Sequence, residues 1–175
     1  MPRTYEQRFK RLMKTAATYR PHKYQSEFVQ PEFNRMIRAE AAAVVGVVPA
    51  VVGGTIYDMA SPLGYCVCVT CGDLHEWNKP KHFGGRLDSG HFLTGNRISL
   101  EETNCHPQCS TCNSWGSGQS SDYRLFMVHV YGQDEIDRLM QLKNARNYEP
   151  PTREWLIEKR IEFEDRTASA VAKMG

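Results

Sequence analysis

Residues 68–72, Cys-Val-Thr-Cys-Gly, and residues 109–113, Cys-Ser-Thr-Cys-Asn, decide the fold of this chain. Each stretch holds a Cys-x2-Cys pair, and 37 residues separate the two pairs. Two such pairs can bring four thiolates to one tetrahedral zinc ion, which closes the enclosed segment into a loop. Because protein fills all four positions on the metal, the predicted zinc is structural. The predicted ligands are Cys68, Cys71, Cys109 and Cys112.

The chain has six cysteines, but its N-terminus lacks the apolar core of a secretory signal. A reducing compartment with a metal site therefore fits better than a disulfide scaffold. A redox role for the Cys-x2-Cys pairs fits poorly, because neither pair opens a helix in a βαβ pattern. Cys66 and Cys105 lie near the pairs and offer competing ligand sets. Cys66 and Cys68 point to one face of the predicted strand, so we expect Cys66 to be packed or a spare thiol.

The composition is that of one globular domain with appendages. The chain has 175 residues, of which 41% are hydrophobic and 24% charged. The longest apolar run, 41–52, contains Gly46 and Pro49 and is too short to span a bilayer. We therefore expect a soluble protein with no membrane partner.

Charge is unevenly distributed along the chain. Residues 1–40 carry nine Lys and Arg against four Asp and Glu, a net charge of +5. Such a basic arm indicates an anionic partner, with nucleic acid as the first candidate. A helix is predicted over 4–19, and its basic residues are candidates for phosphate contact: Arg8, Arg11 and Lys14. The alternative is an amphipathic helix whose basic face is merely solvated.

The remaining pattern mixes short strands with helices. A second helix is predicted from Pro31 to Gly46, and 47–64 is predicted to be a connecting segment. A strand is predicted over 65–70, followed by irregular structure over 73–87. Residues 89–94 and 97–108 are predicted to form a hairpin. Helices are then predicted after Cys109, over 121–131, over 134–142, and after a cap at Thr152.

His91 is the strongest candidate for chemistry inside the zinc-bound loop. Asp88 lies three residues upstream, and Asn104 and Asn113 follow at the spacing of a hairpin and a helix. An imidazole can activate water at neutral pH, while oxygen ligands can hold a hard divalent cation. Asn104 and His106 are expected to alternate on one strand and to point to one face.

Taken together, these motifs resemble the NinG/Rap family of phage recombination endonucleases, within the HNH, or His-Me finger, nucleases. The resemblance lies in Cys68-x2-Cys71-Gly, Asp88-x-Gly-His91-Phe, Asn104-x-His106-x-Gln108-Cys109-x2-Cys112-Asn113, Ser117-Gly118 and Tyr123-Arg124, and covers about 64–170. It implies an α+β protein, with a zinc-bound ββα-metal core flanked by α-helices at both ends. It also implies metal-dependent cleavage of branched DNA, such as D-loops and Holliday junctions, in the cytoplasm of a bacterial host.

The resemblance assigns a role to each matching residue. His91 would be the general base, Asn113 a ligand of the catalytic Mg²⁺ or Mn²⁺, and Asn104 the residue holding the loop that orients His91. Asp88 is the best candidate for a second ligand. In the general HNH pattern a ligand directly precedes the base, whereas this chain has Gly90 there. The alternative is that His91 is itself a ligand and His106 is the base.

Three arginines flank this site in sequence and are candidates for DNA contact: Arg86, Arg97 and Arg124. We expect a basic helical extension over 1–60, the nuclease core over 61–131 and a helical extension over 132–175. Cleavage at paired positions of a junction would need a homodimer. The alternatives are an HNH endonuclease acting on linear duplex DNA and a non-catalytic zinc-stabilised DNA-binding module.

Overall fold

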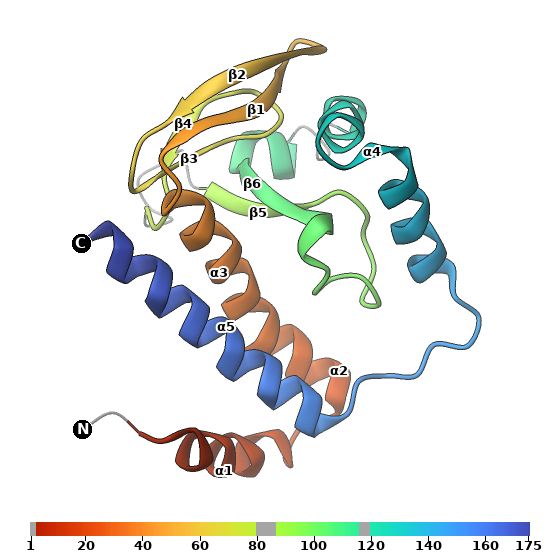
Figure 1. The fold of residues 1–175 in the computed structure, drawn as a ribbon. Helices are drawn as coiled ribbons and strands as arrows, with labels where there is room; N and C mark the ends of the chain where they lie inside the picture. The colour runs from red at the N-terminus through yellow and green to blue at the C-terminus, as the bar shows by residue number, and fades with distance from the viewer. Residues whose placement is uncertain (1–2, 80–86, 116–119) are drawn as a thin grey trace.

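The computed structural model describes residues 3–79, 87–115 and 120–175 of the chain, and Figure 1 shows their arrangement. The helices are α1 (Tyr5–Ala16), α2 (Pro21–Tyr24), α3 (Gln30–Ala42), α4 (Ser120–Asn144) and α5 (Arg153–Met174). The strands are β1 (Gly46–Val52), β2 (Thr55–Ser61), β3 (Tyr65–Val67), β4 (Leu74–Glu76), β5 (Leu87–His91) and β6 (Cys105–Cys109). The strands pair into three two-stranded antiparallel sheets. The fold is thus mixed α+β with helices at both ends, as the sequence predicted.

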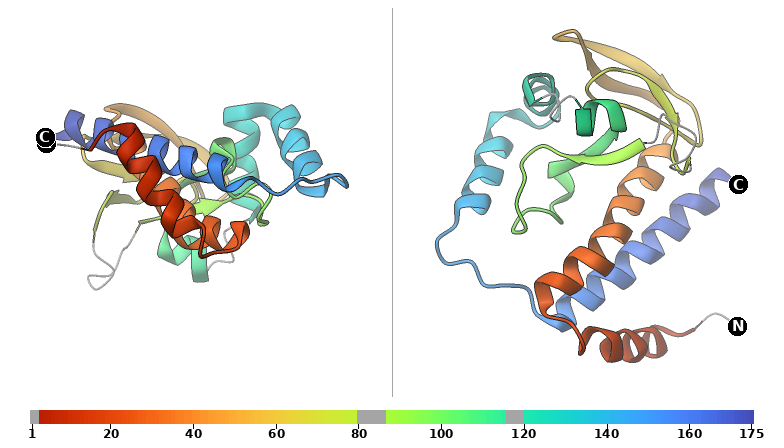
Figure 2. Two further views of the ribbon diagram at one scale, coloured as in Figure 1. Left: turned by 90° about the horizontal axis from the view of Figure 1, so that it is seen from below. Right: turned by 180° about the vertical axis from the view of Figure 1, so that it is seen from behind.

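The terminal helices form one layer. α3 and α5 lie side by side and run in the same direction (Figures 1 and 2). The rings of Phe33 and Phe163 meet edge to face between them, with their centroids 5.2 Å apart. Arg166 on α5 binds both carboxylate oxygens of Glu40 on α3 at 2.8 Å. α1 packs against α5 and begins at the predicted cap, where Thr4 and Gln7 form a capping box. No helix among the described residues is both long and apolar enough to cross a membrane.

The second helical region begins earlier than predicted. It starts at Pro21 rather than Pro31 and continues through a π-helical turn, Gln25–Val29, into α3. Pro21 suits a first helical turn just as Pro31 does, because its missing N–H would be unpaired there anyway. The extra helix brings Gln25 and Gln30 toward the loop that follows β5, where both donate hydrogen bonds.

The predicted connecting segment 47–64 is instead the β1–β2 hairpin. Its two strands pair from Gly46 with Ser61 to Val52 with Thr55, around a turn at Gly53 and Gly54 that both have positive φ. Val51 is fully buried in a core cluster with residues of α4. Val47 and Val52 of the same strand are exposed, so burial accounts for only part of the valine-rich composition of the segment.

The hairpin around His91 has shorter strands and a longer connection than predicted. β5 and β6 pair from Leu87 with Cys109 to His91 with Cys105, and 92–104 connects them. Asn104 ends a short 3-10 helix, Glu102–Asn104, and so lies outside the strand that holds His106. The hairpin lies between α3 and α4 (Figure 1): Ser89 donates to Asn34 O at 2.7 Å, and Tyr123 donates to Gly90 O at 2.7 Å.

Three further predictions can be compared with the structure. The segment 73–87 is not wholly irregular, because β4 pairs with β3 within it. The break predicted near Gly132 is confirmed as a kink in α4, where Gly132 has φ 81° and ψ 170°. The cap at Thr152 is also confirmed, since its side chain accepts from Trp155 N at 3.2 Å.

Candidate functional site

The four predicted cysteines meet in one cluster. Their sulfur atoms all lie within 4.8 Å of one another, and Cys71 Sγ is 3.9 Å from Cys109 Sγ. Zinc–sulfur bonds of about 2.3 Å place the sulfurs of a tetrahedral site about 3.8 Å apart. The cluster therefore fits zinc without rearrangement of the backbone.

The backbone supports this geometry. Cys109 N donates to Cys68 Sγ at 3.3 Å, and Cys112 N donates to Cys109 Sγ at 3.4 Å. Gly72 has φ 78° and turns the chain back after the first pair, where a Cβ atom would collide with Val52. Burial raises the pKa of the Cys112 thiol to about 11, with repulsion from Cys68 adding to the effect. Four thiolates therefore need a cation among them, which zinc would supply.

Asp88 and Asn113 come together next to this cluster. Asp88 lies on β5 and Asn113 in the π-helical turn Thr111–Trp115, directly after the last cysteine. Asn113 Nδ2 is 3.3 Å from Asp88 Oδ2. The amide nitrogen of Asn113, not its oxygen, therefore faces the carboxylate. Hard divalent cations prefer carboxylate and amide oxygens, so both residues could bind one only with the Asn113 amide turned over.

His91 ends β5 and is partly buried. Its Nε2 lies 3.0 Å from the carbonyl oxygen of Ser99, which can only accept, so Nε2 carries the proton. In this neutral form Nδ1 holds the lone pair, and it has no hydrogen-bond partner in the described residues. Burial lowers the pKa of His91, and the hydrogen bond to Ser99 opposes part of that effect. The imidazole is therefore held in its basic form at neutral pH.

Gln30 of α3 fixes the acceptor of this hydrogen bond. Its side-chain nitrogen donates to Ser99 O at 3.0 Å and to Asn34 Oδ1 at 2.9 Å, and it lies 3.4 Å from His91 Nε2. The carbonyl oxygen of Ser99 thus receives two N–H groups, which sets the orientation of the His91 ring. Gln30 lies outside the segment that carried the sequence resemblance.

Asn104 ties together the loop that follows His91. The residue is fully buried, and its Oδ1 accepts from Leu93 N at 2.8 Å. Its Nδ2 donates to Leu93 O at 2.9 Å and to Ile98 O at 3.1 Å. One side chain thereby closes the loop 93–98, next to the Ser99 carbonyl that holds His91.

His106 is buried away from this loop. Its Nδ1 lies 3.0 Å from Tyr123 Oη, which itself donates to Gly90 O, so Nδ1 carries the proton and donates. Its Nε2 accepts from Tyr131 Oη at 2.9 Å. Burial lowers the pKa of His106 to about 3. Both ring nitrogens are occupied by tyrosines, which leaves none for a water or a cation.

The alternation of β5 separates Asp88 from His91. Side chains of a strand point alternately to its two faces, so residues 88 and 91 leave from opposite faces. Their hydrogen bonds agree, since Asp88 contacts Asn113 while His91 contacts the loop end near α3. β5 is an edge strand of its two-stranded sheet, so a ligand lying across that edge could reach both side chains.

A cavity of about 250 Å³ opens beside His91, between the loop and α2. Two histidines, His91 and His22, line it, together with polar residues that expose mostly apolar surface, and it contains no carboxylate among the described residues. His22 was not predicted as a site residue, because its proximity to His91 depends on how α2 packs.

The six basic residues expected to contact DNA occupy different environments. Arg8 forms salt bridges with Glu164 at 2.9 Å and Asp165 at 2.5 Å, which anchor α1 to α5. Arg97 binds the carbonyl oxygens of Lys143 and Ala145. The other described residues expected to contact DNA are exposed: Arg11, Lys14 and Arg124. Arg86 lies outside the described residues, as do Ser117 and Gly118.

The fold and the site define a mixed α+β protein with a cluster of four cysteines that could bind zinc and a hairpin that presents a histidine beside a small cavity. A comparison with protein-family models then identifies the family. The model described as "Bacteriophage Lambda NinG protein" matches residues 63–170, and the chain belongs to this family.

Curated relatives agree with this assignment. "Protein ninG" of Escherichia phage lambda is 27% identical over 84 residues, which cover 46% of this chain and 37% of the relative. "Protein ninG" of Salmonella phage P22 is 28% identical over 75 residues, covering 41% of this chain and 33% of the relative. The matches thus span well under half the length of these relatives. No solved structure matches the chain.

Proposed function

We propose that this protein is a metal-dependent endonuclease of the HNH type that hydrolyses DNA phosphodiester bonds at branched recombination intermediates. The observation that carries the proposal is the state of His91. Its Nε2–H is engaged by Ser99 O, its Nδ1 has no hydrogen-bond partner among the described residues, and His91 lines a cavity with no carboxylate among those residues. That is the arrangement required of a general base, because the base must be unprotonated and must approach the water it activates.

The roles of the neighbouring residues follow from their contacts. Nδ1 of His91 takes the proton of a water molecule that attacks phosphorus. Asn104 and Gln30 keep the Ser99 carbonyl in place, so the imidazole does not rotate away. Asp88 and Asn113 would hold Mg²⁺ or Mn²⁺, which supplies positive charge to the phosphate and the leaving oxygen. His106 is not part of this set, since both of its ring nitrogens are hydrogen-bonded to tyrosines of α4.

The phosphodiester would lie across the edge of β5, in reach of both faces of the strand. Exposed basic residues on α1 and α4 offer sequence-independent contacts to the flanking backbone, with Arg11, Lys14 and Arg124 as candidates. The preference for branched DNA rests on the resemblance to phage recombination endonucleases.

The test is cleavage of a labelled four-way junction and of a matched linear duplex, with Mg²⁺ or with EDTA. The proposal expects metal-dependent cutting of the junction, which His91→Ala abolishes and His129→Ala leaves intact. His129 is a matched control because it is an exposed histidine of α4. Each variant is first checked for zinc content and for cooperative unfolding.

The other outcomes separate the alternatives. Equal cutting of the junction and the duplex would replace the branched substrate by linear DNA. Binding of either substrate without cutting, under any divalent metal, would replace the enzyme by a zinc-stabilised DNA-binding module. Cutting that survives His91→Ala would remove His91 from the role of base.

A further inference from the structure

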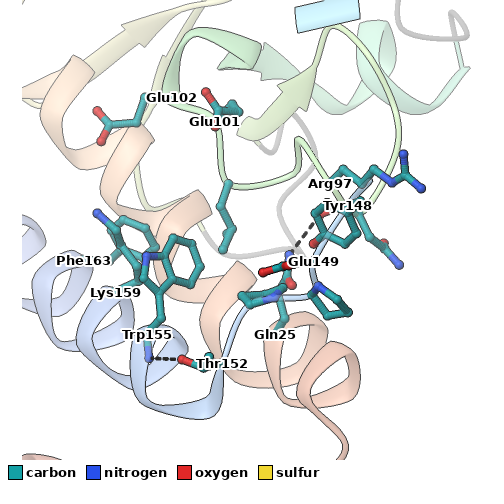
Figure 3. A pocket seen from close by; sticks show the side chains of 14 residues that line it. Gln25, Arg97, Glu101, Glu102, Tyr148, Glu149, Thr152, Trp155, Lys159 and Phe163 are labelled. Carbon is teal, nitrogen blue, oxygen red and sulfur yellow. Dashed lines mark hydrogen bonds between the residues drawn. The ribbon is translucent and has the colours of Figure 1, made fainter. Parts of the chain in front are cut away.

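We propose that the pocket between α5 and the loop 92–104 binds an unpaired base of the DNA substrate. This inference rests on the proposed function. The pocket has a volume of about 600 Å³ and is shown in Figure 3. Pockets of this size hold ligands larger than a nucleobase, so space does not limit the fit. None of its lining residues among the described ones belongs to β5, the strand that carries Asp88 and His91.

Two aromatic side chains supply the surfaces on which a base could stack. Trp155, in the first turn of α5, is 39% exposed, and Lys159 Nζ lies 5.9 Å from its ring centroid. Tyr148 belongs to the segment before α5, and the Arg97 guanidinium lies 4.9 Å from its ring centroid. Figure 3 shows Trp155 and Lys159 on one side of the pocket and Arg97 with Tyr148 on the other. Trp155 is thus an exposed ring with a cation beside it, which is the usual platform for an unpaired base, while Tyr148 is half-buried beneath the Arg97 guanidinium.

The wall formed by Tyr148 is held in place by Arg97. The guanidinium donates to the backbone carbonyl oxygens of Lys143 and Ala145 while it stacks on the tyrosine. Arg97 therefore joins the loop after β5 to the chain that leads into α5. The platform is built before any ligand arrives, which lowers the entropic cost of binding.

The charges of the pocket favour a base over a phosphate. The lining holds three carboxylates, Glu101, Glu102 and Glu149, against the two cations Arg97 and Lys159, so it offers no excess of positive charge to a phosphate. Arg138 and Arg166 already bind Glu101 and Glu102. Carboxylates and amides can instead accept hydrogen bonds from the exocyclic amino groups of bases. Gln25 offers such an amide, held by its own donation to Asn96 O at 3.2 Å.

The pocket adjoins the cavity beside His91. Gln25 and Asn96 line both of them, so one wall separates the aromatic pocket from the carboxylate-free space next to the candidate base. A phosphate in the smaller cavity would leave a neighbouring base at the mouth of the aromatic pocket. A base paired and stacked inside a duplex cannot enter it, whereas a base next to a branch point can.

The test measures binding without cleavage, so its result does not depend on whether the protein cuts DNA. Wild type, with its zinc content checked, is titrated without chelator and without added Mg²⁺ or Mn²⁺ against a branched DNA and a linear duplex. The branched DNA carries 2-aminopurine at an unpaired position beside the branch. The base analogue reports stacking through its fluorescence. We expect Trp155→Ala to bind the branched probe roughly tenfold more weakly, equivalent to about 1.4 kcal/mol, with duplex binding unchanged. Trp155→Phe should retain most of the affinity.

The matched control is Tyr57→Ala, which removes an exposed aromatic ring from β2, a strand that does not line the pocket. It should leave both titrations unchanged. Equal affinity of wild type and Trp155→Ala for the branched probe would overturn the proposal, and so would an equal loss for the two DNAs. Inactivity of the wild type toward junctions would refute the endonuclease while leaving the base-binding result intact.

Discussion

Gly90 lies directly beneath the side chain of Gln108. A Cβ atom at residue 90 would be 3.0 Å from Gln108 Cβ and would collide with its Oε1. Gln108 is fully buried, and its Nε2 donates to Thr70 Oγ1 at 2.9 Å, which links β6 to the first cysteine pair. A glycine therefore precedes His91 because Gln108, next to Cys109 of the cysteine cluster, occupies the space where a side chain would stand.

Gly90→Ala should destabilise the protein by about 1–3 kcal/mol, because the added methyl group displaces a buried side chain. Urea unfolding measures the change. Gly175→Ala is the control, since a Cβ atom there meets nothing within 4 Å. In a Gln108→Ala background the same substitution should cost less, and equal costs in both backgrounds would refute the steric explanation.

Asn104→Ala should destabilise the protein by roughly 2–4 kcal/mol, since three hydrogen bonds of a buried side chain are lost and their partners are left unpaired. Amide exchange at Leu93 should accelerate, because its N–H donates to Asn104. Asn144→Ala removes an exposed asparagine at the end of α4 and should have little effect. Unchanged exchange at Leu93 would mean that Asn104 does not hold the loop.

The pH dependence of cleavage should reflect His91. Burial lowers its pKa below the ordinary value of about 6.5, and a general base acts only when unprotonated. The single-turnover rate should therefore rise with pH, reach half its plateau below pH 6.5 and stay level through neutral pH. A midpoint above 7 would contradict this environment for the base.

Loss of zinc should unfold the region that holds the hairpin. Cys71→Ser removes one of the four sulfurs, so the metal content should fall from about one zinc per chain toward none, with loss of cooperative unfolding. Cys66→Ser is the matched control, because its thiol donates to Arg38 O and lies outside the cluster. Metal analysis by mass spectrometry decides the result. Full zinc content in Cys71→Ser would exclude the four-sulfur site.

His106 should make the protein acid-sensitive. Its folded pKa of about 3 lies below the unfolded value of about 6.5, so the unfolded chain binds the proton more tightly. The stabilisation is complete above pH 6.5 and is lost as the pH falls toward 3, on the order of 4–5 kcal/mol across that window. The difference in free energy of unfolding between wild type and His106→Gln should therefore shrink as the pH falls from 6.5 toward 3. A difference independent of pH would show that His106 is protonated in the folded state.

Several features could be predicted because their causes are local. A helix cap depends on a side chain and the backbone three residues away, so Thr4 and Thr152 were identified correctly. The break at Gly132 likewise follows from one residue that tolerates positive φ. The cysteine cluster joins distant residues, but metal chemistry restricts the spacing of its two pairs, and this restriction made it predictable.

Other features depended on which surfaces pack together. Gly and Pro in 47–64 suggested a connecting segment, whereas burial of Val51 against α4 stabilises a hairpin there. Arg8 was expected to be available to phosphate, but the packing of α1 on α5 places it against two carboxylates. Such pairings join residues far apart in the chain, and no local pattern specifies them.

The sequence by itself determined the metal centre, the helix ends and the short list of residues capable of chemistry, because each follows from residue type and spacing. Only the tertiary structure distinguished the two candidate histidines. Packing of α4 buries His106 between Tyr123 and Tyr131, while the loop held by Asn104 leaves Nδ1 of His91 with its lone pair. The reason is physical: the basicity of an imidazole depends on its burial and its partners, which long-range packing sets.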